Sequence, residues 1–177
     1  MTQDSTSTKI KPIETKYKGY RFRSRLEARW AIFFDSLGIK WEYEPEGYNL
    51  REYGWYLPDF YLPQPDYFAE VKPENVVIQK EKYIQFAKLT QKAIIILVGT
   101  PDLKFYNSFV PATWETNDHV EEYDVFVSTY HNYYIDEHRF YGCPGSDDPS
   151  KEGVADDCDY IAIEAARSAR FEHGERP

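Results

Sequence analysis

Three acidic residues and one lysine in the first half of the chain have side chains suited to hydrolytic chemistry: Glu27, Asp59, Glu70 and Lys72. Two carboxylates that face each other repel unless a cation lies between them. An amine beside such a pair can orient or deprotonate a water molecule. The residue types therefore indicate a site for hydrolysis of a phosphodiester, provided that the fold brings them together.

The spacing of these residues suits two adjacent strands. Alternation along a strand places Glu70 and Lys72 on one face and turns Val71 to the opposite, apolar face. The connection 61–67 is short enough for a hairpin, so Asp59 on one strand would lie close to Glu70 on the next.

Oxygen ligands of this kind favour Mg²⁺ or Mn²⁺. We expect Asp59, Glu70 and the backbone carbonyl of Val71 to bind the ion, with Glu27 completing the set or helping to hold a second ion. Lys72 would act beside the attacking water. We therefore predict Asp59, Glu70 and Lys72 as catalytic residues.

Each of these residues also has a structural interpretation. Ser24 followed by Glu27 is a capping box, and a side chain engaged in a cap is not free to ligate an ion. Asp59 would be a turn-facing carboxylate after Pro58. Glu70 and Lys72 would form an ion pair on one face of a strand, which contributes about 0.5 kcal/mol at a surface.

The surrounding pattern predicts the elements that position these residues. A leader over residues 1–15 is polar and is expected to be mobile, and the core follows over 16–101. Apolar spacing from Leu26 to Leu37, closed by Gly38, predicts a helix. After that helix the pattern predicts strands at 39–43, 56–61 and 67–72, a helix at 77–92 and a buried strand at 93–98.

The last part of the chain, 102–177, is an acidic extension that we expect to pack on the core. Its pattern predicts strands within 123–130 and 133–141, a loop at 142–153 and a helix at 156–171. Aromatic side chains there either stack on unpaired bases or, as is more common at strand spacing, form core. The four histidines and two cysteines have no zinc-like spacing, so no zinc site is assigned.

The sequence Pro58-Asp59, followed by Glu70-Val71-Lys72, resembles the PD-(D/E)xK nuclease superfamily. The segments 22–29 and 56–60 also look like the endonuclease subunits of heteromeric transposases and small phage or mobile-element endonucleases. The resemblance covers about 17–99. It implies an α/β (α+β) fold, a restriction-endonuclease-like αβββαβ core with a central mixed sheet flanked by helices, to which the extension adds a C-terminal β/α part.

In those families the helix acid, the Asp and the Glu bind metal and the Lys is catalytic, which the resemblance carries onto Glu27, Asp59, Glu70 and Lys72. Gln79 and Tyr83 have the spacing of a motif found after Glu-x-Lys in recombination-type and CRISPR-associated exonucleases. Their distance from Lys72 is too short for that motif, so we expect ordinary residues of the helix surface.

Charge is unevenly distributed along the chain. Residues 1–29 carry a net charge of +5 and residues 102–177 a net charge of −11, within a total of −9. The basic segment leads directly into the Glu27 helix, so it would hold DNA phosphates beside the site, or else pair with the acidic extension. The residues predicted to bind DNA are Lys18, Arg21, Arg23, Arg25 and Arg29.

The function predicted from these features is a Mg²⁺- or Mn²⁺-dependent endodeoxyribonuclease, of phage or mobile-element type by resemblance. The alternative is a catalytically silent module of the same fold that binds DNA or a partner protein. The sequence leaves open the form of the DNA, RNA as a substrate, and a homodimer or a partner bound through the acidic extension. No apolar run is long enough to span a membrane, and a cytoplasmic location is expected.

Overall fold

A computed structural model describes residues 12–111, 119–128, 139–141 and 157–171. The described residues form an α+β structure with a central mixed sheet and three α-helices. None of these helices combines the length and the apolar character needed to span a membrane.

The central sheet has seven strands in the order β11-β10-β9-β8-β7-β6-β3. Neighbouring strands are antiparallel except for β7 with β8 and β10 with β11, which are parallel. Strands that follow residue 101 therefore extend the same sheet as those that precede it. The bounds are β3 Glu42–Tyr43, β6 Phe60–Leu62, β7 Tyr67–Lys72, β8 Ala93–Val98, β9 Phe105–Pro111, β10 Val120–Ser128 and β11 Arg139–Tyr141.

Two small antiparallel ribbons lie outside this sheet. One joins β1 (Thr15–Tyr17) to β2 (Tyr20–Phe22) through a two-residue turn. Both residues of that turn, Lys18 and Gly19, have positive φ, as type I′ turns require. The other ribbon pairs β4 (Tyr48–Asn49) with β5 (Trp55–Tyr56) around a short 3₁₀ helix, η1 (Arg51–Tyr53).

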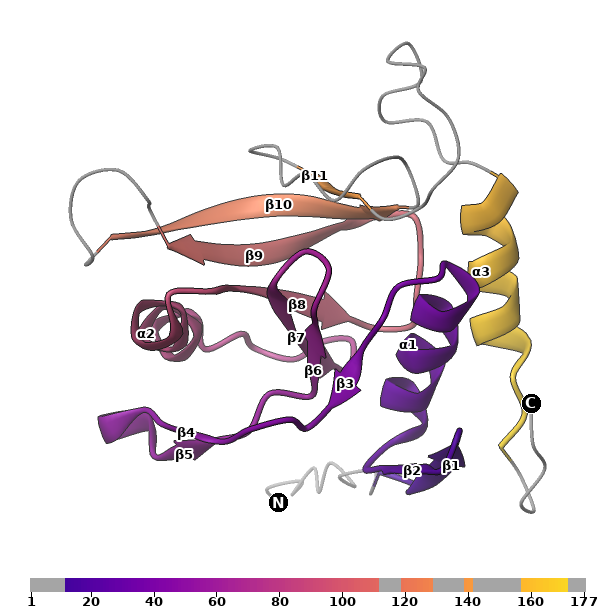
Figure 1. Cartoon of the computed structure of the whole chain (residues 1–177), viewed down its shortest axis with the longest axis horizontal. Coiled ribbons are helices and arrows are strands. Elements are labelled where there is room, and N and C mark those ends of the chain that lie inside the picture. Colours follow the sequence, from indigo (N-terminus) through magenta and orange to yellow (C-terminus); the bar gives the residue numbers. More distant parts are fainter. Residues whose placement is uncertain (1–11, 112–118, 129–138, 142–156, 172–177) are drawn as a thin grey trace, which may run out of the picture.

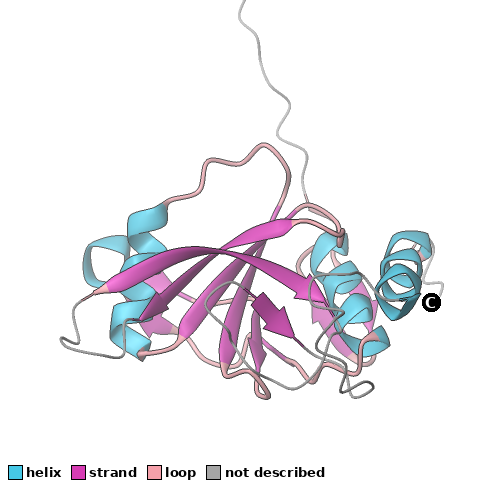
Figure 2. Cartoon of the chain, turned by 90° about the horizontal axis from the view of Figure 1, so that it is seen from above, coloured by secondary structure: helices cyan, strands magenta, loops and turns pink. Residues whose placement is uncertain are grey.

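Helices cover both faces of the central sheet (Figure 1). α2 (Lys80–Thr90) packs on one face, and α1 (Arg25–Ser36) packs on the other with α3 (Asp157–Ser168) beside it. Figure 2 shows the same separation from above, with α2 on one side of the sheet and the α1 and α3 pair on the other.

Two apolar cores result from this arrangement. The larger joins α1 and α3 to the face of the sheet that carries Ala69, Val71 and Ile95. The smaller joins α2 to the face that carries Phe68 and Ile94. β8 contributes to both, as expected for a strand buried on both faces.

The predicted helix after Ser24, the strands 67–72 and 93–98 and the last helix are confirmed, with small shifts of their ends. The predicted strand 56–61 is wrong as one element. It is divided between β5 and β6 because Pro58 has no N–H to donate and restricts the backbone of Leu57. The predicted strand 39–43 is reduced to β3, and α2 begins three residues later than predicted.

Other elements were not predicted: the β1–β2 hairpin, the β4–β5 ribbon and β9. Thr15, placed at the end of the leader from the sequence, begins β1 and is buried. Most of the predicted leader and the predicted loop 142–153 lie outside the described residues. Of the aromatic residues predicted to stack or to form core at 123–141, four have their backbone in β10 or β11, but none of the aromatic side chains is described.

Candidate active site

The C-terminal end of β7 brings an acid and an amine together. Glu70 and Lys72 lie on the face that also carries Phe68, while Val71 packs into the core with α1, as the alternation predicts. Lys72 Nζ donates to Glu70 Oε1 in an ion pair, and Tyr56 Oη donates to Glu70 Oε2 at 2.8 Å. Glu70 is only 4% exposed, so both of its oxygens are satisfied within the protein.

Asp59 lies in the break between β5 and β6, directly before Phe60. Phe60 pairs with Ala69, so Asp59 lies beside the end of β7 where Glu70 is located. Its Oδ2 accepts a hydrogen bond from the Val71 backbone N–H at 2.7 Å, and its carbonyl accepts one from the Glu44 N–H at 2.9 Å. The carboxylate thus takes the place of a main-chain partner at the end of the sheet.

Burial and nearby charge both act on Asp59. Burial raises the pKa of Asp59 well above its ordinary value, and the charges of Glu70 and Glu27 raise it further. The Val71 hydrogen bond and the charge of Lys72 oppose this rise only in part. Burial and repulsion together thus disfavour the charged form of Asp59.

Glu27 is held by its own helix start and by β3. Ser24 Oγ donates to Oε1 at 2.6 Å, and the Arg23 N–H and Tyr43 Oη donate to Oε2 at 3.1 and 2.6 Å. Ser24 Oγ also accepts from the Glu27 N–H at 3.2 Å. The structural interpretation of Glu27 as part of the helix cap thus has three donors in its favour.

The end of β7 is fixed by a short chain of hydrogen bonds. The Gly99 N–H donates to the Lys72 carbonyl at 2.8 Å, and the buried Trp30 Nε1–H donates to the Gly99 carbonyl at 2.9 Å. Gly99 has φ +77°, and a Cβ there would lie 2.8 Å from Glu74 Oε1. Glycine at this position thus allows α1 to hold the backbone of Lys72.

The sequence did not single out Tyr56 and Lys82, and it misjudged Tyr83. Tyr83 was expected on the helix surface but is 2% exposed, whereas Gln79 is exposed as predicted. Burial raises the pKa of Tyr83, and the charges of Glu70 and Asp59 raise it further. The apolar stripe that Tyr83 shares with Phe86 and Ala87 on α2 was the available signal.

Asp59 and Glu70 present only oxygen atoms, the ligands that a divalent cation such as Mg²⁺ prefers. Asp59 Oδ1 accepts no hydrogen bond from a described residue, whereas both oxygens of Glu70 accept bonds from Tyr56 and Lys72. Both oxygens of Glu27 are engaged in the same way. Within the described ranges, no group of three His, Cys, Asp or Glu side chains is placed to hold a metal.

The basic side chains predicted to bind DNA have partners within the chain. Lys18 pairs with Asp35 at 2.8 Å, Arg21 with Glu14, and Arg23 Nε with Glu44 Oε1 at 2.6 Å. Because the Glu44 N–H binds the Asp59 carbonyl, Glu44 connects Arg23 to the backbone of Asp59.

The last two basic residues are less accessible. Arg29 Nη1 donates to the carbonyls of Ala166 and Arg167, both at 2.5 Å, at the C-terminal end of α3. Arg25 is partly buried. Burial lowers the pKa of Arg29, and the charge of Arg25 lowers it further. Arg29 thus binds the extension through backbone carbonyls, not through the acidic side chains that were expected as its partners.

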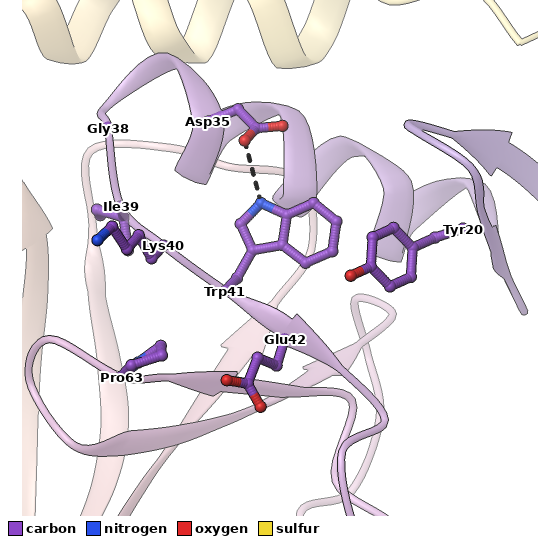
Figure 3. A pocket seen from close by; sticks show the side chains of 8 residues that line it. All are labelled: Tyr20, Asp35, Gly38, Ile39, Lys40, Trp41, Glu42 and Pro63. Carbon is purple, nitrogen blue, oxygen red and sulfur yellow. Dashed lines mark hydrogen bonds between the residues drawn. The ribbon is translucent and has the colours of Figure 1, made fainter.

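A pocket of about 460 Å³ lies at the C-terminal end of α1, whereas Glu27 is in the first turn of that helix (Figure 3). Trp41 Nε1 donates to Asp35 Oδ1 at 3.3 Å across it, and Tyr20 lies beside the Trp41 ring. Asp35 is eight residues from Glu27, which is about 12 Å along a helix. None of the four predicted catalytic or metal-binding side chains lines this pocket.

Comparison of the chain with protein-family models, with curated proteins and with solved structures finds no match in any of the three.

Proposed function

We propose that this chain is a divalent-metal-dependent endodeoxyribonuclease that hydrolyses DNA phosphodiester bonds. The observation that carries the proposal is the meeting of Asp59 and Glu70 at one end of the sheet, with Lys72 bonded to Glu70. Two adjacent buried acids are unfavourable for stability, because burial and the charge of Glu70 both raise the pKa of Asp59; such an arrangement is typical of functional sites.

The order of the elements supports the same proposal. α1 is followed by the antiparallel strands β3, β6 and β7, then by α2 and by β8, which is parallel to β7. This order is what the resemblance to the PD-(D/E)xK superfamily implies for its αβββαβ core. The β4–β5 ribbon and η1 are insertions into that order.

The residues of the site have distinct roles in this proposal. Asp59 and Glu70 would hold Mg²⁺ or Mn²⁺, which when bound supplies charge neutralisation of the phosphate and activation of water. Lys72 Nζ, fixed by Glu70, would orient the attacking water by a hydrogen bond. Tyr56 keeps Glu70 in place through its hydroxyl, and Glu27 adds negative charge from a distance.

Supercoiled plasmid, linear duplex and single-stranded DNA, each incubated with Mg²⁺, Mn²⁺ or a chelator, test the proposal. The parent chain should cut at least one of them only with a divalent ion. Lys72→Met should lower the rate by about 10²- to 10⁴-fold, because it removes the group that positions the water. Lys88→Met is the matched control. It removes a lysine from the last turn of α2, and it should cut like the parent. Equal cutting by Lys72→Met would refute the assignment.

One observation favours the second candidate, a module of this fold that binds DNA or a protein without cutting. Both oxygens of Glu70 and both of Glu27 already accept hydrogen bonds within the chain. Such a module would bind DNA in the same incubations and leave every substrate intact with either ion.

A further inference from the structure

Lys82 lies beside the candidate site in a position that the roles above leave unused. It is on the first turn of α2, and its Nζ lies 3.9 Å from the ring centroid of Tyr56 and 5.6 Å from that of Tyr83. The Tyr56 ring thus holds Lys82 on its face while its hydroxyl holds Glu70. One side chain therefore connects the lysine to the acids.

The electrostatic surroundings of Lys82 are those of the same cluster. Burial lowers the pKa of Lys82, the charges of Glu70 and Asp59 raise it, and the charge of Lys72 lowers it. Lys82 thus lies within electrostatic range of Asp59, Glu70 and Lys72.

The Lys82 ammonium nevertheless has no acceptor among the described residues. Lys18, Lys72, Lys80 and Lys92 each form an ion pair with a carboxylate. The Nζ of Lys82 forms neither an ion pair nor a hydrogen bond with any residue that the structure describes, and contacts only the two rings. A half-buried ammonium against aromatic faces keeps its charge available for an anion, because a ring attracts a cation without using its N–H groups.

We propose that Lys82, seated on Tyr56 and Tyr83, forms a phosphate-binding position at which a non-bridging oxygen of the DNA backbone is bound next to Asp59 and Glu70. The identity of the anion as a DNA phosphate rests on the proposed function. The position lies on the α2 side of the sheet, whereas the basic segment 16–29 lies on the α1 side (Figure 1). The DNA strand would then be held from both sides of the acids.

The salt dependence of DNA binding in chelator tests this position without any cutting. A fluorescent duplex and a fluorescent single strand are titrated by anisotropy at several salt concentrations. Each phosphate contact contributes about 0.9 to the slope of log K against log salt for a duplex, and about 0.7 for a single strand. Lys82→Met should lower the slope by that amount for every sequence.

Two variants serve as controls for this measurement. Lys82→Arg retains the charge and should keep the parental slope. Lys88→Met removes a lysine from the same helix away from the acids and should also keep it. Thermal unfolding of Lys82→Met reports any loss of packing separately.

Two outcomes overturn the inference and are distinguishable. If the parent binds and cuts DNA but Lys82→Met has the parental slope, only the phosphate position is wrong. If the parent binds neither duplex nor single strand, the phosphate position is overturned together with the proposed function.

Discussion

The acids at the end of β7 and the basic segment 16–29 carry opposite charge, and they differ in burial and in pairing. Glu70 and Glu27 are 4% and 8% exposed. Burial raises the pKa of Asp59, and the charges of these two glutamates raise it further. In the basic segment, the side chains of Lys18, Arg21 and Arg23 are 56–68% exposed, and each is paired with a carboxylate.

This difference shows which charges constrain the fold. An exposed ion pair contributes between 0 and 1 kcal/mol and exchanges readily with an outside partner. Buried acids that repel one another cost free energy unless a ligand compensates them. The acids are therefore the costly charges in the folded chain, whereas the pairs of the basic segment can exchange for an outside partner at little cost.

Arg29→Gln tests whether one residue of the basic segment has a structural role. Its guanidinium binds two carbonyls at the end of α3, and hydrogen bonds to charged groups are worth about 1.5–3 kcal/mol. We expect the free energy of unfolding in urea to fall by that amount. An unchanged unfolding midpoint would mean that Arg29 is as replaceable as its exposed neighbours.

Gly99→Ala tests whether the backbone of Lys72 must be held. A left-handed alanine costs about 1–2 kcal/mol, and its Cβ would also contact Glu74. Gly19→Ala is the control, since Gly19 has φ +85° and nothing within 4 Å of its Cβ. Both variants should lose stability, but only Gly99→Ala should also cut DNA more slowly. Equal rates in the two variants would exclude a positioning role for Gly99.

Asp59→Asn tests whether the buried charge of Asp59 destabilises the folded chain. With its raised pKa, Asp59 holds a proton in the folded chain at pH values where the unfolded chain has lost it. Its contribution to stability is therefore complete below the ordinary aspartate pKa and is lost as pH rises through the folded pKa. In chelator at pH 7.5 the variant should therefore have a higher Tm than the parent. For a chain of this length, each 1 kcal/mol of added stability raises the Tm by about 2–4 °C.

The difference between Asp59→Asn and the parent should shrink as the pH falls toward 4. Asparagine keeps an acceptor for the Val71 N–H, so the loss of charge is the main change. A variant that is less stable than the parent at pH 7.5 would contradict the repulsion described here.

Arg21→Gln should have the smallest effect on stability, within about 0.5 kcal/mol, because its pair with Glu14 is exposed. If the basic segment binds DNA, the salt slope of duplex binding should fall by about 0.9. Urea unfolding and anisotropy on the same preparation measure both quantities. An unchanged slope would assign Arg21 to the internal pair alone.

Local patterns in the sequence were sufficient to predict that Asp59, Glu70 and Lys72 lie close together. Alternation places Glu70 and Lys72 on one face, and a short connection brings Asp59 next to Glu70. The run of aliphatic residues predicts β8 with its observed bounds, Ala93–Val98. These features depend on residues that are close in sequence or are joined by one hairpin.

Features that depend on distant contacts could not be predicted in this way. The Tyr43 hydroxyl that binds Glu27 on α1 comes from β3, and the α3 carbonyls that bind Arg29 come from the far end of the chain. β9 contains Asn107, Ser108 and Pro111, which weaken a strand signal, yet it lies between β8 and β10.

The most direct test of the central claim is the Tm of the parent and of Asp59→Asn, each measured in chelator and in Mn²⁺ without DNA. A ligand that binds only the folded state stabilises it by about 2.7 kcal/mol at 100 times its Kd. We predict a rise in the parent with Mn²⁺ and none in Asp59→Asn. Equal shifts in both chains, or no shift in the parent, would contradict a divalent-ion site at Asp59 and Glu70.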